Sequence, residues 1–322
     1  MIQRIRLLFS LGTAVIACAC SGKVPLGDEG TDESSLGGAG GATGGTGGQT
    51  PGAGGTVTSY PQVSAGAGYT CELLADGTVV CWGGNTSGQA SPPAETFSQV
   101  SAGNDHTCGV QTDGAVACWG DDSFGQATPP AGTFSQVSAG AGFTCGVTTD
   151  RTVACWGGNA SGHATPPAGT FSQVSAGQNH GCGVKTDGSI ACWGDDGYEA
   201  TTPPAGTFSQ VSAGRDYTCG VTTQGTLACW GLDCSAPGPA FCGRATPPDG
   251  VFSQVSAGTF HTCGVRADAT VTCWGDNTFG QSTPPGGTFS QVSVGGEHTC
   301  GVQTDGTVVC WGDDTHGQAS PP

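Results

Sequence analysis

A twelve-residue phrase, "CGVQTDGAVACW" from Cys108 to Trp119, recurs seven times and constrains the fold of this chain more than any other feature. Successive copies begin 37 residues apart, except for one gap of 44, so one unit carries an insertion of seven residues. The units fill residues 57–322, which indicates one repeat architecture rather than several domains. The copies begin at Cys71, Cys108, Cys145, Cys182, Cys219, Cys263 and Cys300.

Each unit reads as short β-strands separated by turn residues. In the second unit the expected strands are 97–102, 107–111 and 115–120, and "GQATPP" is the closing connection. No segment shows a sustained helical period, and 60 glycines with 19 prolines in 322 residues favour turns over helices. Short β-elements at this spacing predict a propeller or a β-solenoid.

The two cysteines of the phrase predict a hairpin disulfide. If residues 112–114 form a three-residue loop with Gly114 in the left-handed conformation, Cys108 lies directly opposite Cys118. Such opposed residues lie about 4.5 to 5.5 Å apart, within reach of a disulfide. A metal site is the weaker interpretation, because no Cys-x2-Cys spacing occurs. The expected pairs are Cys71–Cys81, Cys108–Cys118, Cys145–Cys155, Cys182–Cys192, Cys219–Cys229, Cys263–Cys273 and Cys300–Cys310.

The turn of this hairpin has its own signature. Asp113, Asp187 and Asp305 precede the turn glycine and are interpreted as turn-forming residues. The glycine is replaced by Arg151 in the third unit and by Ala269 in the sixth. Because the left-handed conformation is costly for a residue with a side chain, these two hairpins are expected to be strained.

The pattern "SAGNDHTCGVQTDGAVACWGDDSFGQ" resembles the regulator-of-chromosome-condensation repeat, with its glycine before a His-Thr pair, its Asp-Gly turn, its Trp-Gly pair and its closing Gly-Gln. The resemblance covers residues 57–322 and implies an all-β, closed, seven-bladed β-propeller. With the cysteine pairs, this gives 37-residue blades that each carry one hairpin disulfide. The shorter units, paired cysteines and secretory leader are more similar to secreted bacterial members, so exchange-factor activity and chromatin binding are not expected.

The N-terminal residues resemble a bacterial lipoprotein leader. A basic start is followed by an apolar run over 7–17, which is too short for an ordinary membrane span. "VIAC" at 15–18 resembles a lipobox, which predicts a signal peptide over 1–17 and lipidation of Cys18. The alternatives are cleavage after Ala17 or Ala19 without a lipid, and a weaker lipobox at Cys20. Lipidation would place the protein in a bacterial cell envelope, anchored at the outer membrane or cell surface.

Residues 18–56 are predicted to be a flexible tether. They include "GGAGGATGGTGGQTPGAGG" and have almost no apolar side chains, so burial cannot offset the entropy of ordering them. The propeller is then expected over 57–322, linked to the membrane through the N-terminal lipid alone.

The charge of the chain restricts its partners. The formal net charge is −17, and such a field repels a phosphate backbone, so nucleic acid is not an expected partner. Solubility or a cationic partner remain as interpretations of the acidity.

No set of residues predicts catalysis. An enzyme needs a convergent nucleophile, base and orienting group, or a metal. The histidines His106, His180, His261 and His298 recur at one repeat position, which is typical of a scaffold. The doublets Asp121–Asp122, Asp195–Asp196 and Asp313–Asp314 are interpreted as turn-forming, with calcium binding as the alternative. Neither a cofactor nor a metal is therefore predicted.

Chain direction places the variable residues on one rim. If the first strand of each unit runs upward, the triplet after "SAG" and the loop after "CWG" both lie on the upper rim, while the Asp-Gly turns lie on the lower rim. Aromatic residues among acidic ones are typical of contact surfaces, although drift in unconstrained loops is the alternative. The candidate binding residues are Tyr69, Phe124, Phe143, Tyr198, Tyr217, Phe241, Phe260 and Phe279.

The insertion of the fifth unit, "LDCSAPGPAFCGR", also falls on this rim. Its Cys234 and Cys242 are expected to close a small loop that presents Phe241, and such a loop is preorganised for binding.

Together, these patterns predict a monomeric, non-catalytic module that binds a protein or glycan outside the cytoplasm. The alternatives are a hydrolase or lyase acting at the propeller mouth, and a structural surface protein without a specific ligand.

Overall fold

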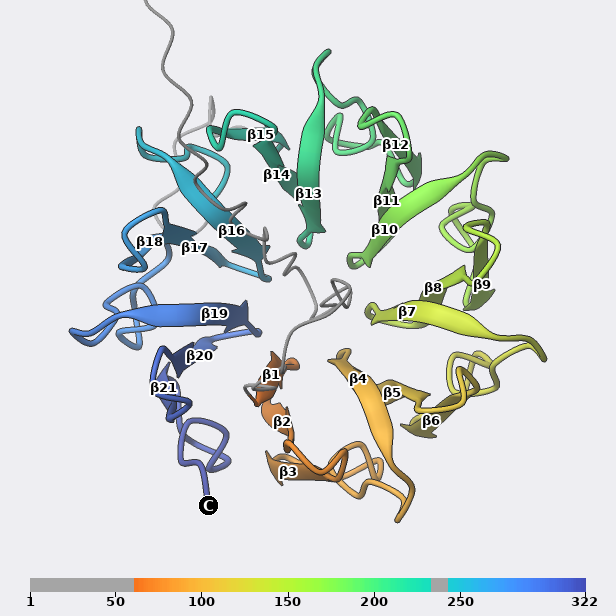
Figure 1. Cartoon of the computed structure of the whole chain (residues 1–322), viewed down its shortest axis with the longest axis horizontal. Coiled ribbons are helices and arrows are strands. Elements are labelled where there is room, and N and C mark those ends of the chain that lie inside the picture. The colour runs from red at the N-terminus through yellow and green to blue at the C-terminus, as the bar shows by residue number, and fades with distance from the viewer. Residues whose placement is uncertain (1–60, 233–242) are drawn as a thin grey trace, which may run out of the picture. The chain divides into compact units, whose positions relative to one another are not determined.

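The computed structural model describes residues 61–232 and 243–322, and in these ranges the chain forms 21 β-strands in seven three-stranded antiparallel sheets. The sheets are blades arranged around a central axis (Figure 1). The first blade meets the seventh, because Val63 N donates to Gln291 Oε1 over 3.1 Å and Gln291 Nε2 donates to Val63 O over 3.0 Å. The prediction of a closed, all-β, seven-bladed propeller is confirmed.

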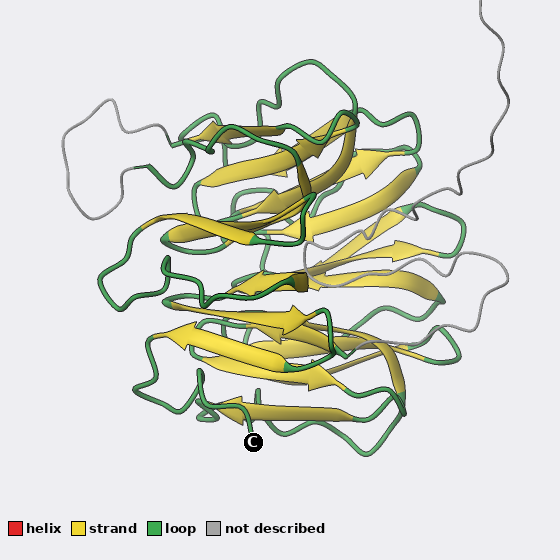
Figure 2. Cartoon of the chain, turned by 60° about the vertical axis from the view of Figure 1, so that its left-hand side comes forward, coloured by secondary structure: helices red, strands yellow, loops and turns green. Residues whose placement is uncertain are grey.

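Each blade has an inner, a middle and an outer strand in chain order. No helix of the described residues is long and apolar enough to cross a membrane (Figure 2). The inner strands are β1 (Gln62–Ala65), β4 (Phe97–Ala102), β7 (Phe134–Ala139), β10 (Phe171–Ala176), β13 (Phe208–Ala213), β16 (Phe252–Ala257) and β19 (Phe289–Val294). The middle strands are β2 (Tyr69–Leu73), β5 (His106–Gln111), β8 (Phe143–Thr148), β11 (His180–Lys185), β14 (Tyr217–Thr222), β17 (His261–Arg266) and β20 (His298–Gln303). The outer strands are β3 (Val79–Gly83), β6 (Val116–Gly120), β9 (Val153–Gly157), β12 (Ile190–Gly194), β15 (Leu227–Gly231), β18 (Val271–Gly275) and β21 (Val308–Gly312).

The hairpin between middle and outer strands has the register that the cysteine spacing predicts. In the second blade Cys108 lies opposite Cys118, and Gly114 has a φ of 89°. Seven disulfides join the seven hairpins, with Cα–Cα distances of 4.0 or 4.1 Å. The predicted hairpin disulfides are confirmed, whereas the predicted pair Cys234–Cys242 lies outside the described residues. Seven intrachain disulfides indicate an oxidising, extracellular compartment.

Among the described residues, three with side chains adopt the left-handed conformation. Arg151 and Ala269 replace the turn glycine with φ angles of 69° and 66°, as expected from their positions. Sequence reasoning missed the third, Glu199, which has a φ of 62° and stands where the second blade has Gly125. Each such residue costs about 1 to 2 kcal/mol relative to an unstrained backbone.

Neighbouring blades are joined through one backbone carbonyl at the position of the closing glutamine, which is occupied by His163, Ala200 and Arg244 in the third to fifth units. In the second blade, Thr107 Oγ1 and Trp119 Nε1 both donate to the carbonyl oxygen of Gln89, over 2.8 and 2.9 Å. The same bonds close the ring, where Thr70 and Trp82 donate to Gln318 O. The tryptophan of the repeated phrase therefore attaches each blade to the blade before it.

The inner strands are joined by side chains that cap their exposed edges. Gln99 Nε2 donates to Val137 O over 2.8 Å, and Val137 N donates to Gln99 Oε1 over 2.7 Å. One step further, Ala139 N donates to Ser101 Oγ over 3.0 Å. All seven junctions carry the equivalent glutamine and serine bonds. The "QVS" that all seven units share thus supplies the partners that an inner strand would otherwise lack on its open side.

Candidate binding rim at the channel mouth

Two sets of loops form one rim, as chain direction predicts. In the second blade, Asp121 N donates to Asp105 O over 2.8 Å, and the equivalent bond joins the two loops in every blade. The Asp-Gly turns lie at the opposite end, where Phe134 N donates to Gly114 O. We call the loops between inner and middle strands the mouth loops (66–68, 103–105, 140–142, 177–179, 214–216, 258–260 and 295–297). The loops that follow the outer strands are called the outer loops (84–90, 121–127, 158–164, 195–201, 276–282 and 313–319). Of the outer loop in the fifth blade, only the flanking residues Leu232, Gly243 and Arg244 are described. The mouth loops and the outer loops together are called the upper rim.

Three predicted binding residues are wrong, because they lie inside the molecule. Tyr69, Phe143 and Tyr217 are 0% exposed. The middle strand begins one residue earlier than its pattern predicts, so the third residue after "SAG" belongs to the strand and points between two blades. The Tyr69 hydroxyl donates to His106 O over 2.6 Å in the next blade. Burial likewise raises the pKa of Tyr217 to about 12.

The recurrent histidines occupy the same buried position, which agrees with a structural role. His106 Nε2 lies 2.8 Å from Thr144 Oγ1 in the next blade, and that hydroxyl donates its own proton to Gln126 O. His106 must therefore carry its proton on Nε2, and within the described residues its Nδ1 has no hydrogen-bond partner. Burial lowers the pKa of His106 to about 4, although Asp121 and Asp122 oppose the shift. The ring is neutral near pH 7 and is poorly placed for proton transfer.

The junction between the third and fourth blades lacks the hydrogen bond between blades that the histidine or tyrosine makes elsewhere, and apolar contacts replace it. Phe143 has no polar group to bond across the junction, and the next blade has Gly181 in place of the usual threonine. A Cβ at Gly181 would lie 2.8 Å from the Trp193 ring, so the tryptophan fills the threonine's space. His163 stacks on Phe143 with ring centroids 4.7 Å apart.

Three predicted aromatic residues are exposed on the outer loops. Phe124, Tyr198 and Phe279 have 68%, 54% and 48% of their surface exposed. The backbone N–H groups of Phe124 and Phe279 donate to the side-chain oxygens of Gln126 and Gln281, each over 2.8 Å, which holds these loops in one shape. These aromatic side chains remain candidates for contact with a partner.

Of the remaining two candidates, Phe260 and Phe241, only Phe260 belongs to the described residues. Phe260 is partly exposed on the sixth mouth loop, and its ring centroid lies 5.8 Å from the guanidinium carbon of Arg215. Phe241 lies outside the described residues. The described flanks of its insertion begin on the rim, because Leu232 N donates to Asp216 O over 2.9 Å.

The aspartate doublets shape the outer loops. Asp121 accepts hydrogen bonds from the Ser123 hydroxyl and from Gln126 Nε2, over 2.5 and 2.6 Å. Asp122 accepts from Ala127 N and from the hydroxyl of Thr128, over 2.8 and 2.7 Å. Among the described residues, no group of three or more His, Cys, Asp or Glu could hold a metal ion. The bonded carboxylates favour the turn-forming interpretation over calcium binding.

A cavity of about 350 Å³ opens at the centre of the upper rim. Backbone and alanine methyl groups from the ends of the inner strands form much of its wall. The larger polar side chains that line it are Asn104, Gln178, Arg215 and Glu297, with the aromatic Phe260 beside them. Burial raises the pKa of Glu297, assisted by the nearby charges of Asp313 and Asp276.

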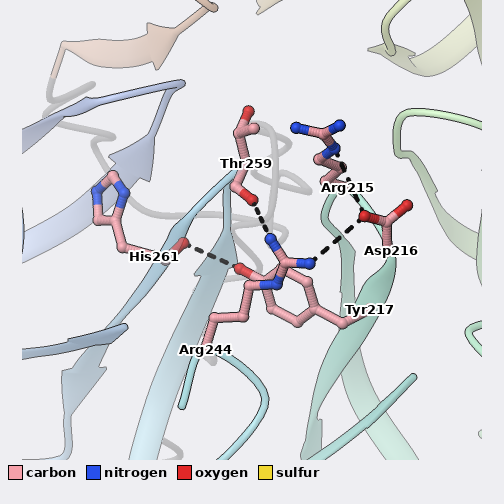
Figure 3. A network of polar contacts seen from close by, with 6 residues as sticks. All are labelled: Arg215, Asp216, Tyr217, Arg244, Thr259 and His261. Carbon is pink, nitrogen blue, oxygen red and sulfur yellow. Dashed lines mark hydrogen bonds and ion pairs between the residues drawn. The ribbon is translucent and has the colours of Figure 1, made fainter. Parts of the chain in front are cut away.

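The junction between the fifth and sixth blades differs from the others because a buried arginine replaces the closing glutamine. Arg244 stands where the second blade has Gln126, and its side chain is 2% exposed. Its Nη1 donates to Thr259 O over 2.8 Å, and its Nη2 lies 3.4 Å from Asp216 Oδ2 (Figure 3). The guanidinium carbon lies 5.2 Å from the centroid of the Tyr217 ring. Sequence reasoning missed Arg244, although counting its unit backwards from the following "TPP" aligns it with the closing glutamine.

The ring of mouth loops is also altered at this junction. At six junctions a backbone N–H of one mouth loop donates to the glycine carbonyl of the next, as Gln178 N does to Gly214 O over 3.2 Å. Among the bonds of the described ranges, the corresponding one from Arg215 N to Gly258 O is absent. The bond that follows, from Thr259 N to Gly295 O, is long at 3.4 Å. Repeat symmetry is therefore broken in backbone and side chains at the same place.

The comparisons with known proteins agree with the fold. The model of the "Regulator of chromosome condensation (RCC1) repeat" matches at 62–89, 97–126, 134–162, 171–199, 208–235, 252–281 and 289–318. No curated protein sequence matches the chain.

Solved structures give the same result. The CRINKLY ectodomain of the receptor kinase ACR4 from Arabidopsis thaliana is 28% identical, with a TM-score of 0.66 over 82% of this chain and 98% of that one. The ectodomain of the receptor kinase CR4 from Physcomitrella patens is 25% identical, with a TM-score of 0.67 over 78% and 73%. Prp20p from Saccharomyces cerevisiae, 14% identical with a TM-score of 0.63 over 82% and 84%, shares the fold. With its seven matched repeats in a closed ring, the chain belongs to the RCC1 repeat family.

Proposed function

We propose that this propeller is a non-catalytic binding module that recognises a protein through its upper rim. RCC1-like propellers are generally non-catalytic binding or regulatory modules. The observation that carries the proposal is where the repeat symmetry breaks. Exposed aromatic side chains, the Arg215–Asp216–Arg244 cluster and the flanks of the one insertion all lie on the same rim.

The chemistry of the rim supports binding over catalysis. Among the described residues that line the cavity there is no histidine or cysteine. Asp216, the carboxylate of the charged cluster, is already engaged by two guanidinium groups. The hydrolase or lyase alternative is therefore less well supported.

A protein suits the rim better than a glycan. Phe124 and Phe279 expose rings without a polar group, and exposed aromatic rings of this kind are typical of protein–protein contact surfaces. The outer loops also expose acidic side chains such as Asp122, Asp196 and Asp314, so a partner with basic residues at its own rim would associate faster.

Affinity capture from envelope and extracellular fractions tests this function. We expect a partner that is retained by the native protein and lost when Phe124, Tyr198 and Phe279 are all replaced by serine. Val251→Ser on the lower rim is the matched control, because Val251 is an exposed apolar residue, 54% exposed, on the opposite face. Equal capture by both variants would refute the rim. If a partner is found, Phe241→Ala is expected to weaken its binding by roughly thirtyfold.

The cellular location of the protein is also part of the proposal. We propose export through the leader and anchoring through a lipid on Cys18, with residues 18–56 as the tether. Mass spectrometry of the mature N-terminus should find an acylated Cys18, and Cys18→Ser should release the protein from membranes. An unmodified N-terminus beginning after Ala19 would contradict the lipid anchor.

A further inference from the structure

Basic side chains are rare in this propeller, and their distribution is uneven. The described residues include five Lys or Arg side chains, of which Arg151, Lys185 and Arg266 belong to the hairpins of the lower rim. The other two, Arg215 and Arg244, both lie on the upper rim and both contact one carboxylate oxygen, Asp216 Oδ2. Two guanidinium groups sharing one carboxylate leave a net positive charge at the fifth–sixth junction, on an otherwise acidic rim.

Arg244 is the buried member of this cluster and fixes its position. It is buried, it donates to the Thr259 carbonyl and it lies against the Tyr217 ring, so its charge cannot move toward solvent. Its contact with Asp216 takes up part of the negative charge that would otherwise neutralise Arg215. A fixed, buried charge of this kind raises the local potential without a cost of reorganisation when a ligand arrives.

Arg215 lines the cavity at the centre of the rim. Its side chain is 40% exposed, and only Nε approaches Asp216, at 3.5 Å. Figure 3 shows the two terminal nitrogens beyond Nε, and no contact within the described residues engages them. The adjoining Phe260 ring, 5.8 Å from the guanidinium carbon, restricts the side chain. The Arg215 backbone N–H, which lacks the bond made at the other six junctions, is a further donor at this place.

We infer that this junction is a carboxylate-binding subsite for an acidic residue of a peptide segment that enters the channel mouth. The inference rests on the proposed function, and names the chemistry that its central subsite selects. A guanidinium with two free terminal nitrogens binds a planar carboxylate through paired hydrogen bonds. The cavity of about 350 Å³ lies at the small end of ligand sites, so it admits a protruding chain segment rather than a folded surface. Backbone groups and methyls on its wall match a peptide's own backbone and apolar atoms.

Immobilised hexapeptide libraries test this subsite without a known partner. Each library has one fixed residue and five random ones, and is synthesised with a free or an amidated C-terminus. We expect the native, disulfide-bonded protein to select Asp and Glu over Asn and Gln, or free over amidated ends. The first result identifies a side-chain carboxylate and the second a chain-end carboxylate, and both support the subsite.

Matched variants decide the role of Arg215. Arg215→Gln should lower the selected binding at least tenfold, Arg215→Lys should restore only part of it, and Arg151→Gln on the lower rim should change nothing. Near-ultraviolet circular dichroism checks that each variant is folded. No acidic or chain-end selection by the native protein, or equal selection by Arg215→Gln, overturns the subsite. The serine variant of Phe124, Tyr198 and Phe279 separates the two proposals. If it loses the captured partner while Arg215→Gln still binds both the partner and the peptides, the subsite is wrong and the rim proposal stands. If no substitution on the upper rim changes capture of the partner, both proposals are wrong.

Discussion

The third–fourth and fifth–sixth junctions solve the same structural problem with opposite chemistry. At the first, Trp193 Nε1 donates to His163 O over 2.8 Å; at the second, Trp274 Nε1 donates to Arg244 O over 2.9 Å. The backbone carbonyl does the same work in both places, while its side chain is an aromatic ring in one and a buried cation in the other. The fold therefore depends on the carbonyl at this position, and the side chain is available for other purposes.

The two junctions also differ in how the change is compensated. At the third–fourth junction, loss of the hydroxyl partner at Phe143 is matched by loss of the threonine at Gly181, so this pair leaves no hydroxyl unpaired. The buried His163 Nδ1 has no hydrogen-bond partner among the described residues, but it carries no charge that needs one. At the fifth–sixth junction, Arg244 adds a charge that requires Asp216 and Thr259 O as partners. Burying a charge costs free energy even when partners satisfy it, so the buried Arg244 is a stronger indication of function than the apolar exchange at Phe143 and Gly181.

The largest effect is expected at the charged junction. Arg244→Met keeps the length of the side chain but removes the partner of Asp216 and of the Thr259 carbonyl, and should lower the free energy of unfolding by about 3 kcal/mol. His163→Gln, the matched change at the apolar junction, should cost less than about 1 kcal/mol, because it restores the common residue. Urea unfolding midpoints measure both. Equal losses would remove the distinction between the junctions.

The apolar junction should reject the consensus residue. Gly181→Thr places a Cβ 2.8 Å from Trp193, and overpacking of this kind should cost about 2 kcal/mol. Adding Phe143→Tyr supplies the hydroxyl that Tyr69 uses at its own junction, so the double variant should recover part of the loss. A double-mutant cycle measures the coupling, and strictly additive losses would contradict the compensation.

Junctions that bury a histidine should weaken in acid, above all the four that carry His106, His180, His261 or His298. Because the pKa of His106 is about 4 in the folded state and about 6.5 when unfolded, the unfolded chain binds more protons between these values. Stability should therefore fall as the pH drops from about 6.5 toward 4, by up to about 1.4 kcal/mol per pH unit for one histidine. His106→Tyr, which copies the first blade, should flatten the profile of the unfolding free energy against pH. An unchanged slope would mean that His106 binds its proton equally well in the folded and the unfolded state.

The smallest effect concerns the outer loop of the fourth unit, next to the apolar junction. Glu199→Gly relieves a left-handed residue and should stabilise the protein by about 1 kcal/mol, seen as a higher urea midpoint. Ala269→Gly in the sixth blade is the matched change at a hairpin turn. A lower midpoint for both would show that the side chains contribute contacts worth more than the strain.

Most of the fold could be predicted from the sequence because its signals are local. The offset of ten between Cys108 and Cys118 and the turn glycine fix the hairpin register, and seven copies fix the number of blades. The capping by Gln99 and Ser101 joins residues of different units, 38 positions apart, so no local pattern reveals it.

The candidate site could be predicted only in part. Chain direction placed both loop sets on one rim, but a strand boundary wrong by one residue placed Tyr69 and Tyr217 outside rather than inside the molecule. Arg244 was missed because the insertion shifts it out of register with the closing glutamines. Its role depends on Asp216 and Thr259, which the folded ring brings to it from two blades.

The glutamine and serine bonds of the inner strands have a consequence for the topology of the ring. The glutamine and serine side chains of each blade reach to the next blade in the same rotational sense, and the junction between the seventh and first blades carries the same bonds as the other six. Within the described residues, the closure of the ring is therefore held by the same contacts as every internal boundary. A circularly permuted chain, cut at an outer loop and joined between the old ends, keeps the full circle of bonds intact.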